Sequence, residues 1–362
     1  SPKINENVAV TSTATEINTL DGVTAGTISA SKAVIVDSNK DISGFRNITG
    51  TGNLTVDGGT VKLDGNYPVG TDNVALGNTA LDSVEAGGIN NVAIGDNAGT
   101  AITTGDNNTA VGKDALLSNT TASNNTAVGI ESLMCNTTGT ANLALGAYAM
   151  CKNTTANNNT AVGAAALLAN TTGANNTGVG KDSLIANTTG ANNVAVGYLS
   201  LDANTTGATN VAMGRGSLGA NTTGSCNVAI GDLALVAATT VSQNTAIGML
   251  SMTATTSGIR NTAVGRQSMC ANTTGCCNVA MGSNALASGT TGDFNVAVGG
   301  AALGSVNTGN CNTAIGACAM NTNTSGANNT AVGKDSLLAN TTGVNNVAVG
   351  KDSLKTNTTA SG

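Results

Sequence analysis

The chain has 362 residues, of which only 9% are charged and 1% aromatic, with no histidine or tryptophan and a formal net charge of −6. It carries no basic run, so binding to nucleic acid through phosphate neutralisation is not expected. No stretch approaches the roughly 18 apolar residues that a membrane-spanning helix needs, so membrane insertion is not expected either. The start, Ser1-Pro2-Lys3, does not have the pattern of a secretory signal peptide. Low complexity is typical of disorder, but the low charge and the regularly spaced apolar residues argue against it.

Residues 1–70 differ from the rest of the chain, because they lack the repeat that follows. Residues 13–16, Thr-Ala-Thr-Glu, fit a helix capping box and Gly22 fits a helix end, so a short helix is predicted over 14–21. Strands are predicted over residues 34–36, 53–58 and 60–63, the last two joined through Gly58-Gly59. The boundary of this N-terminal region is placed near Tyr67-Pro68.

A 17-residue repeat fills residues 71–362, with the motif Asn-(Thr/Val)-Ala-(aliphatic)-Gly at its centre. The motif glycine recurs every 17 residues from Gly95 to Gly350, and Gly77 lies one residue out of step. We number each repeat from this glycine as position 0. Position −4 is then Asn, −3 Thr or Val, −2 Ala, −1 aliphatic, +3 Ala or Ser, +4 Leu or Met, and +7 to +10 commonly Asn-Thr-Thr-Gly. The exceptions at these central positions are Leu143 at −3, Gly178 at −2 and Gly99 at +4.

The alternation over positions −4 to −1 predicts a β-strand that ends at the glycine. The aliphatic residues at −3 and −1, such as Val196, are expected to face the coil interior. A second short strand is predicted around the Leu at +4, followed by a turn at Asn-Thr-Thr-Gly. Each repeat then forms one coil of a parallel β-solenoid, and sixteen coils stacked about 4.8 Å apart give a rod on the order of 77 Å long. A helical solenoid is disfavoured, because its repeats are about 33 to 47 residues long.

The alanine column at −2 lies on the strand face opposite the aliphatic residues, so it is expected to lie outside the coil. A position that accepts only tiny side chains indicates close approach of another backbone. We therefore predict that this column lines a contact between copies of the chain, and that the protein self-associates. The column includes Ala195, Ala212, Ala229 and Ala246.

The repeat, clearest at 159–173 and 329–343, resembles repeats of bacteriophage tail fibres and related appendage proteins. Residues 15–24 and 41–48 also resemble phage fibre segments. The same columns are similar to the heads of trimeric autotransporter adhesins, although the period here is longer and no heptad stalk or membrane anchor is visible. The resemblance implies a left-handed β-roll and a homotrimer. It also implies a mature, processed fragment, because such fibres often carry a self-cleaving chaperone that does not follow Gly362.

These observations lead to an expected function. Residues 1–70 are interpreted as an attachment or collar region and residues 71–362 as the shaft of a viral fibre, which spaces or presents a host-binding tip. The expected location is extracellular, on a virion, with host-surface glycans or a receptor as further partners. The alternative is a bacterial cell-surface filament or adhesin, and an ice-binding solenoid is a more distant one.

No catalytic, cofactor or metal site is predicted, and the protein is not expected to be an enzyme. Without histidine, Ser–His and Cys–His pairs are impossible. Carboxylates recur at position +2, where they form either a charged ladder or ion site or, the interpretation we prefer, a solvated face. These carboxylates are Asp114, Asp182, Asp335 and Asp352.

The Asn-Thr-Thr units also match glycosylation sequons, although turn residues are the preferred interpretation. The sequons include Asn170, Asn187, Asn204 and Asn221. Thr188 and Thr189 are adjacent, so they are expected to face different ways, which disfavours ice binding. Among the eight cysteines, Cys135 and Cys151 are the better candidates for a disulfide, whereas Cys277 and Cys311 lie two coils apart; free thiols are the default.

Overall fold

The computed structural model describes residues 3–4, 8–9, 70–305 and 308–362, and the chain divides into two units, Ser1–Lys62 and Leu63–Gly362. In the first unit, the described residues form an antiparallel pair of short strands, β1 (Lys3–Ile4) and β2 (Val8–Ala9), which the sequence analysis did not predict. The helix predicted over 14–21, the strands predicted over 34–36, 53–58 and 60–63, and the boundary at Tyr67-Pro68 lie outside the described residues.

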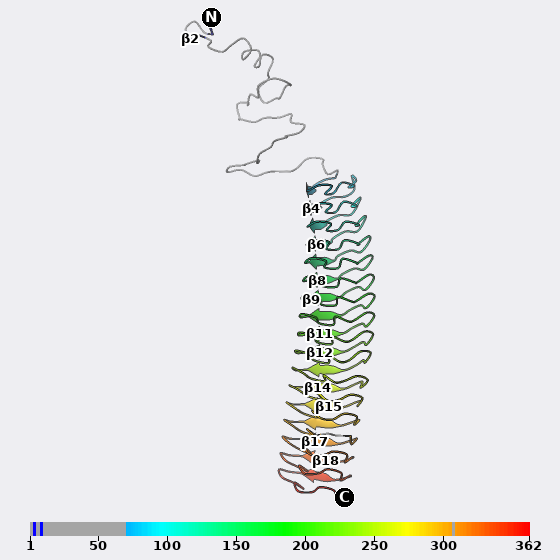
Figure 1. Ribbon diagram of the computed structural model, residues 1–362, viewed down its shortest axis with the longest axis vertical. Coiled ribbons are helices and arrows are strands. Elements are labelled where there is room, and N and C mark those ends of the chain that lie inside the picture. Colours follow the sequence, from blue (N-terminus) through cyan, green and yellow to red (C-terminus); the bar gives the residue numbers. More distant parts are fainter. Residues whose placement is uncertain (1–2, 5–7, 10–69, 306–307) are drawn as a thin grey trace. The chain divides into compact units, whose positions relative to one another are not determined.

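The second unit is a parallel β-solenoid with one three-residue strand in each coil (Figure 1). The strands are β3 (Val74–Leu76), β4 (Val92–Ile94), β5 (Thr109–Val111), β6 (Thr126–Val128), β7 (Leu143–Leu145), β8 (Thr160–Val162), β9 (Thr177–Val179), β10 (Val194–Val196), β11 (Val211–Met213), β12 (Val228–Ile230), β13 (Thr245–Ile247), β14 (Thr262–Val264), β15 (Val279–Met281), β16 (Val296–Val298), β17 (Thr313–Ile315), β18 (Thr330–Val332) and β19 (Val347–Val349). The all-β solenoid predicted from the repeat is therefore confirmed.

The register of the strands follows the repeat. Each strand pairs in parallel with the equivalent strand of the next coil, so that Ala195 lies opposite Ala212, 17 residues later. The first step is one residue longer, because Val74 pairs with Val92. This extra residue accounts for the glycine that is out of step in the sequence. The pairs run from β3 to β19 without a skipped coil.

The prediction of a second strand around position +4 is wrong. Residues +1 to +6 form turns, and the leucine at +4 has a left-handed backbone, as at Leu184, where φ is 51°. The neighbouring Ser183 and Leu184 are both fully buried. Two adjacent inward side chains are incompatible with a strand, in which successive side chains point to opposite faces. The adjacent positions +3, always Ala or Ser, and +4, almost always Leu or Met, carried this signal in the sequence.

The predicted orientation of the main strand is also wrong. Ala195 at position −2 is 0% exposed and points into the coil, whereas Val196 at −1 is 36% exposed and points out. The coil is narrow: its interior holds one large apolar side chain, such as Leu184, together with small residues and asparagines. The alanine is therefore small because it faces the same coil's interior, and not because another chain approaches it.

An uninterrupted ladder of buried asparagines runs through the coils at position −4, and we call it the first ladder. Asn193 illustrates its bonds. Its Nδ2 donates to the Gly207 carbonyl at 2.8 Å and to Asn176 Oδ1 at 3.2 Å. Its Oδ1 accepts bonds from the backbone N–H and Nδ2 of Asn210, at 3.0 and 3.2 Å. Each of these side chains thereby satisfies its own amide and joins three coils, which a buried polar group requires.

A second ladder of buried asparagines lies at position +7. Asn187 Nδ2 donates to Asn170 Oδ1 at 2.8 Å and to the Gly190 carbonyl at 3.0 Å, and its Oδ1 accepts a bond from Asn204 Nδ2 at 2.7 Å. The side chain therefore joins three coils and closes its own turn. This second ladder is interrupted. Asn221 Oδ1 has no donor, because the next residue in the column is Ala238.

The glycine at position 0 is required for two reasons. Gly180 has a φ of 131°, a conformation that residues with a side chain rarely adopt. A Cβ at this site would also lie 2.6 Å from the carbonyl oxygen of Gly197 in the next coil. The column of glycines therefore lets the coils stack at the spacing of a parallel sheet.

Candidate interaction surface

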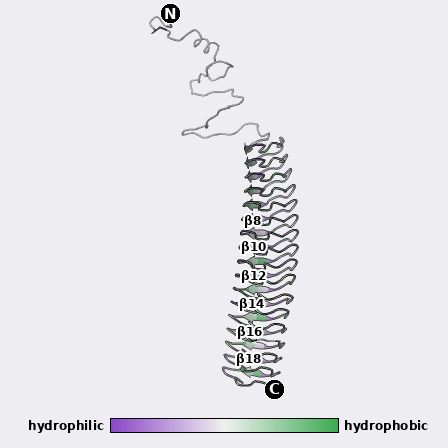
Figure 2. Cartoon of the chain, viewed as in Figure 1, coloured by the Kyte–Doolittle hydropathy of each residue, from purple (hydrophilic) through white to green (hydrophobic). Residues whose placement is uncertain are grey.

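The side chains at positions −3 and −1 of β3–β19 form a continuous band along one side of the solenoid, which we call the outer strand face. Every residue on it is Val, Ile, Leu, Met or Thr, and none is charged. Figure 2 shows the hydrophobic colours gathered on the strand side and hydrophilic colours on the turns at the opposite edge. The strand therefore directs its larger apolar side chains away from the coil interior.

Exposure values show that no other part of the described solenoid covers this face. Met213 and Met281 are 40% and 43% exposed, although coils lie above and below each of them. Val349, in the last strand, is 68% exposed. Stacking thus covers the edges of these side chains, while their outer surfaces remain open to a partner or to water.

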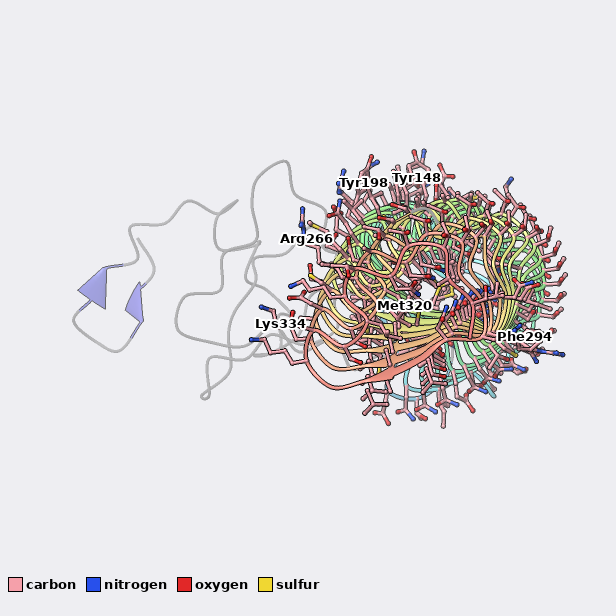
Figure 3. The ribbon with its side chains drawn as sticks, turned by 90° about the horizontal axis from the view of Figure 1, so that it is seen from below. Tyr148, Tyr198, Arg266, Phe294, Met320 and Lys334 are labelled. Atoms are coloured by element: carbon pink, nitrogen blue, oxygen red, sulfur yellow. The ribbon has the colours of Figure 1, made fainter. Side chains whose placement is uncertain are left out.

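The alanine column, which we expected to form the contact between chains, does not reach the surface. All four residues named for it are 0% exposed and lie in the hydrophobic core: Ala195, Ala212, Ala229 and Ala246. The end-on view in Figure 3 shows the same division for other positions, with Met320 inside the coil and Tyr148, Tyr198 and Phe294 projecting outward. Sequence reasoning found the two strand faces but assigned them the wrong way round.

The four aspartates named at position +2 are partly exposed, and each lies beside the lysine that precedes it. Asp114 and Asp182 each contact the lysine directly before them, Lys113 at 3.9 Å and Lys181, respectively. Among the described residues, no group of three or more His, Cys, Asp or Glu side chains could hold a metal ion.

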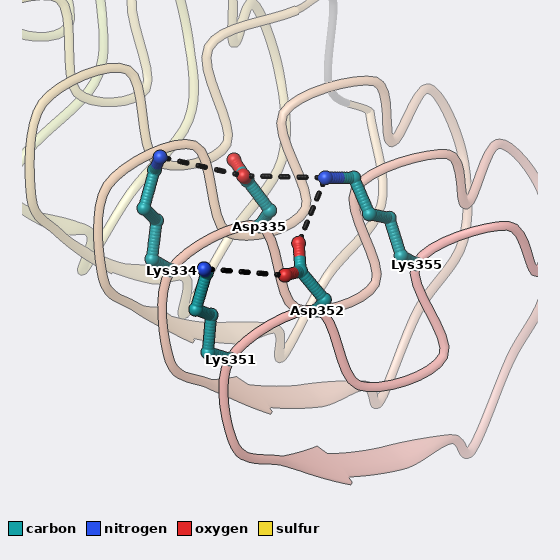
Figure 4. A network of polar contacts seen from close by, with 5 residues as sticks. All are labelled: Lys334, Asp335, Lys351, Asp352 and Lys355. Carbon is teal, nitrogen blue, oxygen red and sulfur yellow. Dashed lines mark hydrogen bonds and ion pairs between the residues drawn. The ribbon is translucent and has the colours of Figure 1, made fainter.

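Only the last two carboxylates of the column are brought together (Figure 4). Lys355 Nζ lies 3.4 Å from Asp335 Oδ2 and 2.7 Å from Asp352 Oδ1. Lys334 and Lys351 complete the network at 3.7 Å from their neighbouring aspartates. The hydrogen bond from Lys355 lowers the pKa of the Asp352 carboxyl. Sequence reasoning did not single out Lys355, although its spacing of three residues from Asp352 was a usable signal.

The asparagines of the sequons are interior residues. Asn170, Asn187, Asn204 and Asn221 are 0% exposed, and their Nδ2 atoms donate to neighbouring coils and turns. The folded solenoid therefore does not present these amides to a glycosylating enzyme. The burial of these asparagines supports the interpretation that they are structural residues of the turns.

The two threonines of each turn differ, as expected from their adjacency. Thr188 is half-buried, and its hydroxyl donates to the Thr205 carbonyl at 3.0 Å. Thr189 is exposed. This turn therefore presents one exposed threonine rather than two.

All eight cysteines are free thiols. Cys135 and Cys151 are neighbours in adjacent coils, and the Cys135 amide donates to the Cys151 carbonyl at 3.0 Å. Burial, and to a lesser degree the adjacent Cys135, raises the pKa of the Cys151 thiol to about 11. This thiol is therefore protonated and unreactive at neutral pH.

The described residues contain no helix long and apolar enough to cross a membrane. Fold and surface together define a parallel β-solenoid repeat protein with an uncharged outer strand face. Comparison with models of known protein families gives no match, and comparison with curated protein sequences gives none either.

Proposed function

We propose that this chain is the structural shaft of an extracellular fibre, a homotrimeric virion appendage that spaces or presents a host-binding tip. The observation that carries the proposal is the unbroken parallel register from β3 to β19. A structure in which each coil contacts only its neighbours grows in one dimension, and its length is set by the number of repeats. Such a rod suits a spacer.

Two further observations support a role without a catalytic step. The sequence has no histidine, which removes the commonest general base. The four aspartates of position +2 are engaged with neighbouring lysines on the surface. The resemblance of the repeat to phage fibres and adhesin heads supports the extracellular location, the three copies and the contact of a fibre tip with host-surface glycans or a receptor.

Electron microscopy of the purified protein tests the shape. Rods on the order of 77 Å long are expected for the solenoid, from sixteen steps of about 4.8 Å. Compact particles would contradict the proposal. Imaging the protein in its native particle with a labelled antibody then tests the location: signal on virions supports the viral fibre, and signal on bacterial cells would replace it with a surface filament.

A further inference from the structure

We infer that the outer strand face is the surface through which copies of this chain associate, side by side, parallel and with equivalent coils at the same height. The inference deepens the proposed fibre function and rests on it. It assigns the contact to positions −3 and −1, the face opposite to the buried alanine column.

The size of the face fits a stable interface. A three-residue strand spans about 10 Å, and the stack is about 77 Å long, so the face covers roughly 800 Å² per chain. Two such faces bury about 1,600 Å² in total, the standard size of a stable protein–protein interface. The largest apolar patch on a monomer is typically about 300–600 Å². Eight of the 34 positions on the band are threonine, so its aliphatic part, roughly 600 Å², lies at the upper end of that range.

Chemistry supports burial of this face. The adjacent positions +1 and +2 carry lysine, arginine, aspartate and glutamate, whereas the outer strand face carries no charge at any of its strands. Charges depleted from one band and retained beside it give the pattern of an interface core with a polar rim. A partner that recognises charge would find nothing to bind on this band.

Geometry identifies the partner as a second copy. A partner that covers the whole face must present complementary side chains at the pitch of a parallel sheet, about 4.8 Å, over about 77 Å. Another copy of the chain has this pitch over the same length by construction. A partner of unrelated shape would match only a few coils.

The residues at −3 provide a register. Along the stack they read as short blocks of valine and threonine, with Leu143 the one exception. At equal height threonine meets threonine and valine meets valine, so the hydroxyls can bond across the contact. A slide of two coils places threonine opposite valine or leucine at nearly every step, which buries hydroxyls without partners.

Charged substitutions on the face test the contact. Val196→Asp together with Met213→Asp is expected to leave the circular dichroism unchanged, because both side chains point out of the coil, and to weaken association at least tenfold by native mass measurement. Thr189→Lys, on the exposed turn, is the control and keeps the wild-type mass. Association that survives the double substitution unchanged would overturn the inference.

Charge complementation tests the register. Thr245→Lys and Thr245→Glu chains each repel their own copies at equal height, so each is expected to remain unassembled, and a mixture is expected to form pairs of one Lys chain and one Glu chain. Thr245→Lys mixed with Val279→Glu, two coils away, should stay unassembled. Assembly of the second mixture alone would contradict equal height. If wild-type protein forms rods of the expected length but has the mass of one chain, the proposed interface is wrong and the proposed shaft still stands. If the protein forms no rods, the proposed shaft is wrong as well.

Discussion

In the coil interior, asparagine contacts between coils form ladders, whereas the ion pairs between coils on the surface are isolated. Asn193 in the first ladder is fully buried and bonded to coils on both sides. Arg215 and Asp232 also join adjacent coils, with two bonds of 2.8 and 2.9 Å, but both side chains are exposed to water. The contacts have similar lengths, yet the interior residue is repeated in every coil and the surface pair is not.

Solvent explains this difference. Water replaces a lost surface bond, so exposed ion pairs typically contribute little to stability. A buried amide that loses its partner has no substitute, and the desolvation cost of about 1–3 kcal/mol per group remains. Position −4 is therefore asparagine in every coil, while the surface positions vary. Substitutions in each region should separate these contributions.

The largest effect is expected for Asn193→Leu in the first ladder. The change removes four hydrogen bonds, to the Gly207 carbonyl, to Asn176 Oδ1 and from the N–H and Nδ2 of Asn210, and it leaves the buried Asn210 N–H without an acceptor. At about 1 kcal/mol for each bond, a local loss of about 4 kcal/mol is expected. Hydrogen exchange of the flanking coils measures it. Asn157→Leu is the matched control: its exposed Oδ1 accepts bonds from the Thr140 N–H and hydroxyl in the adjacent coil, and the variant should have little effect because water replaces exposed bonds. Equal exchange in the two variants would refute the role of the ladder.

Asn187→Leu in the second ladder should have a smaller effect, about 2–3 kcal/mol, because fewer bonds join this column to other coils. The column already tolerates Ala238 and Gly289 at equivalent positions. The same exchange experiment applies. A loss larger than that of the first-ladder variant would reverse the order we assign to the two ladders.

Restoring asparagine at a coil where the second ladder is interrupted should stabilise the protein. Ala238 and Val241 are both buried and together replace the Asn and Gly of other coils. The double change Ala238→Asn with Val241→Gly supplies a donor to Asn221 Oδ1 and is expected to gain about 1 kcal/mol. Thermal denaturation measures the gain. Val241→Gly alone, the control, should destabilise, because it only removes apolar contacts.

The smallest effect is expected for Asp232→Asn at the surface. The hydrogen bond from Arg215 lowers the pKa of the Asp232 carboxyl. A lowered folded pKa stabilises the fold above the ordinary carboxyl pKa, and this contribution disappears as pH falls through the lowered value. Melting temperatures of wild type and variant should therefore differ slightly at pH 7, less in high salt, and not at all below the lowered pKa. A difference in melting temperature that grows as the pH falls would contradict the expected direction of the effect.

The sequence predicted the period, the strand, the stacking and the terminal glycine bend correctly, because each depends on local pattern. It could not orient the strand. Ala195 and Val196 alternate equally well in either orientation, and the choice depends on how wide the coil is. That width is set by turns with unusual backbones: Asp182, Leu184 and Asn192 have φ of 57°, 51° and 60°. Asparagine accepts this conformation readily, but leucine rarely does, so propensity indicated a strand instead.

The direction of the hydrogen bonds between coils has a mechanical consequence. The bond from the Val194 N–H to the Asn210 carbonyl, at 2.8 Å, joins adjacent coils, and equivalent bonds recur along the stack. Bonds between neighbouring strands run across the strands, hence along the axis of the solenoid. A pull along that axis loads the coils in series, so a single chain peels apart one coil at a time. The first rupture is expected at an interruption of the second ladder, such as the one at Ala238 and Thr255. Copies held at equal height would share the same force in parallel.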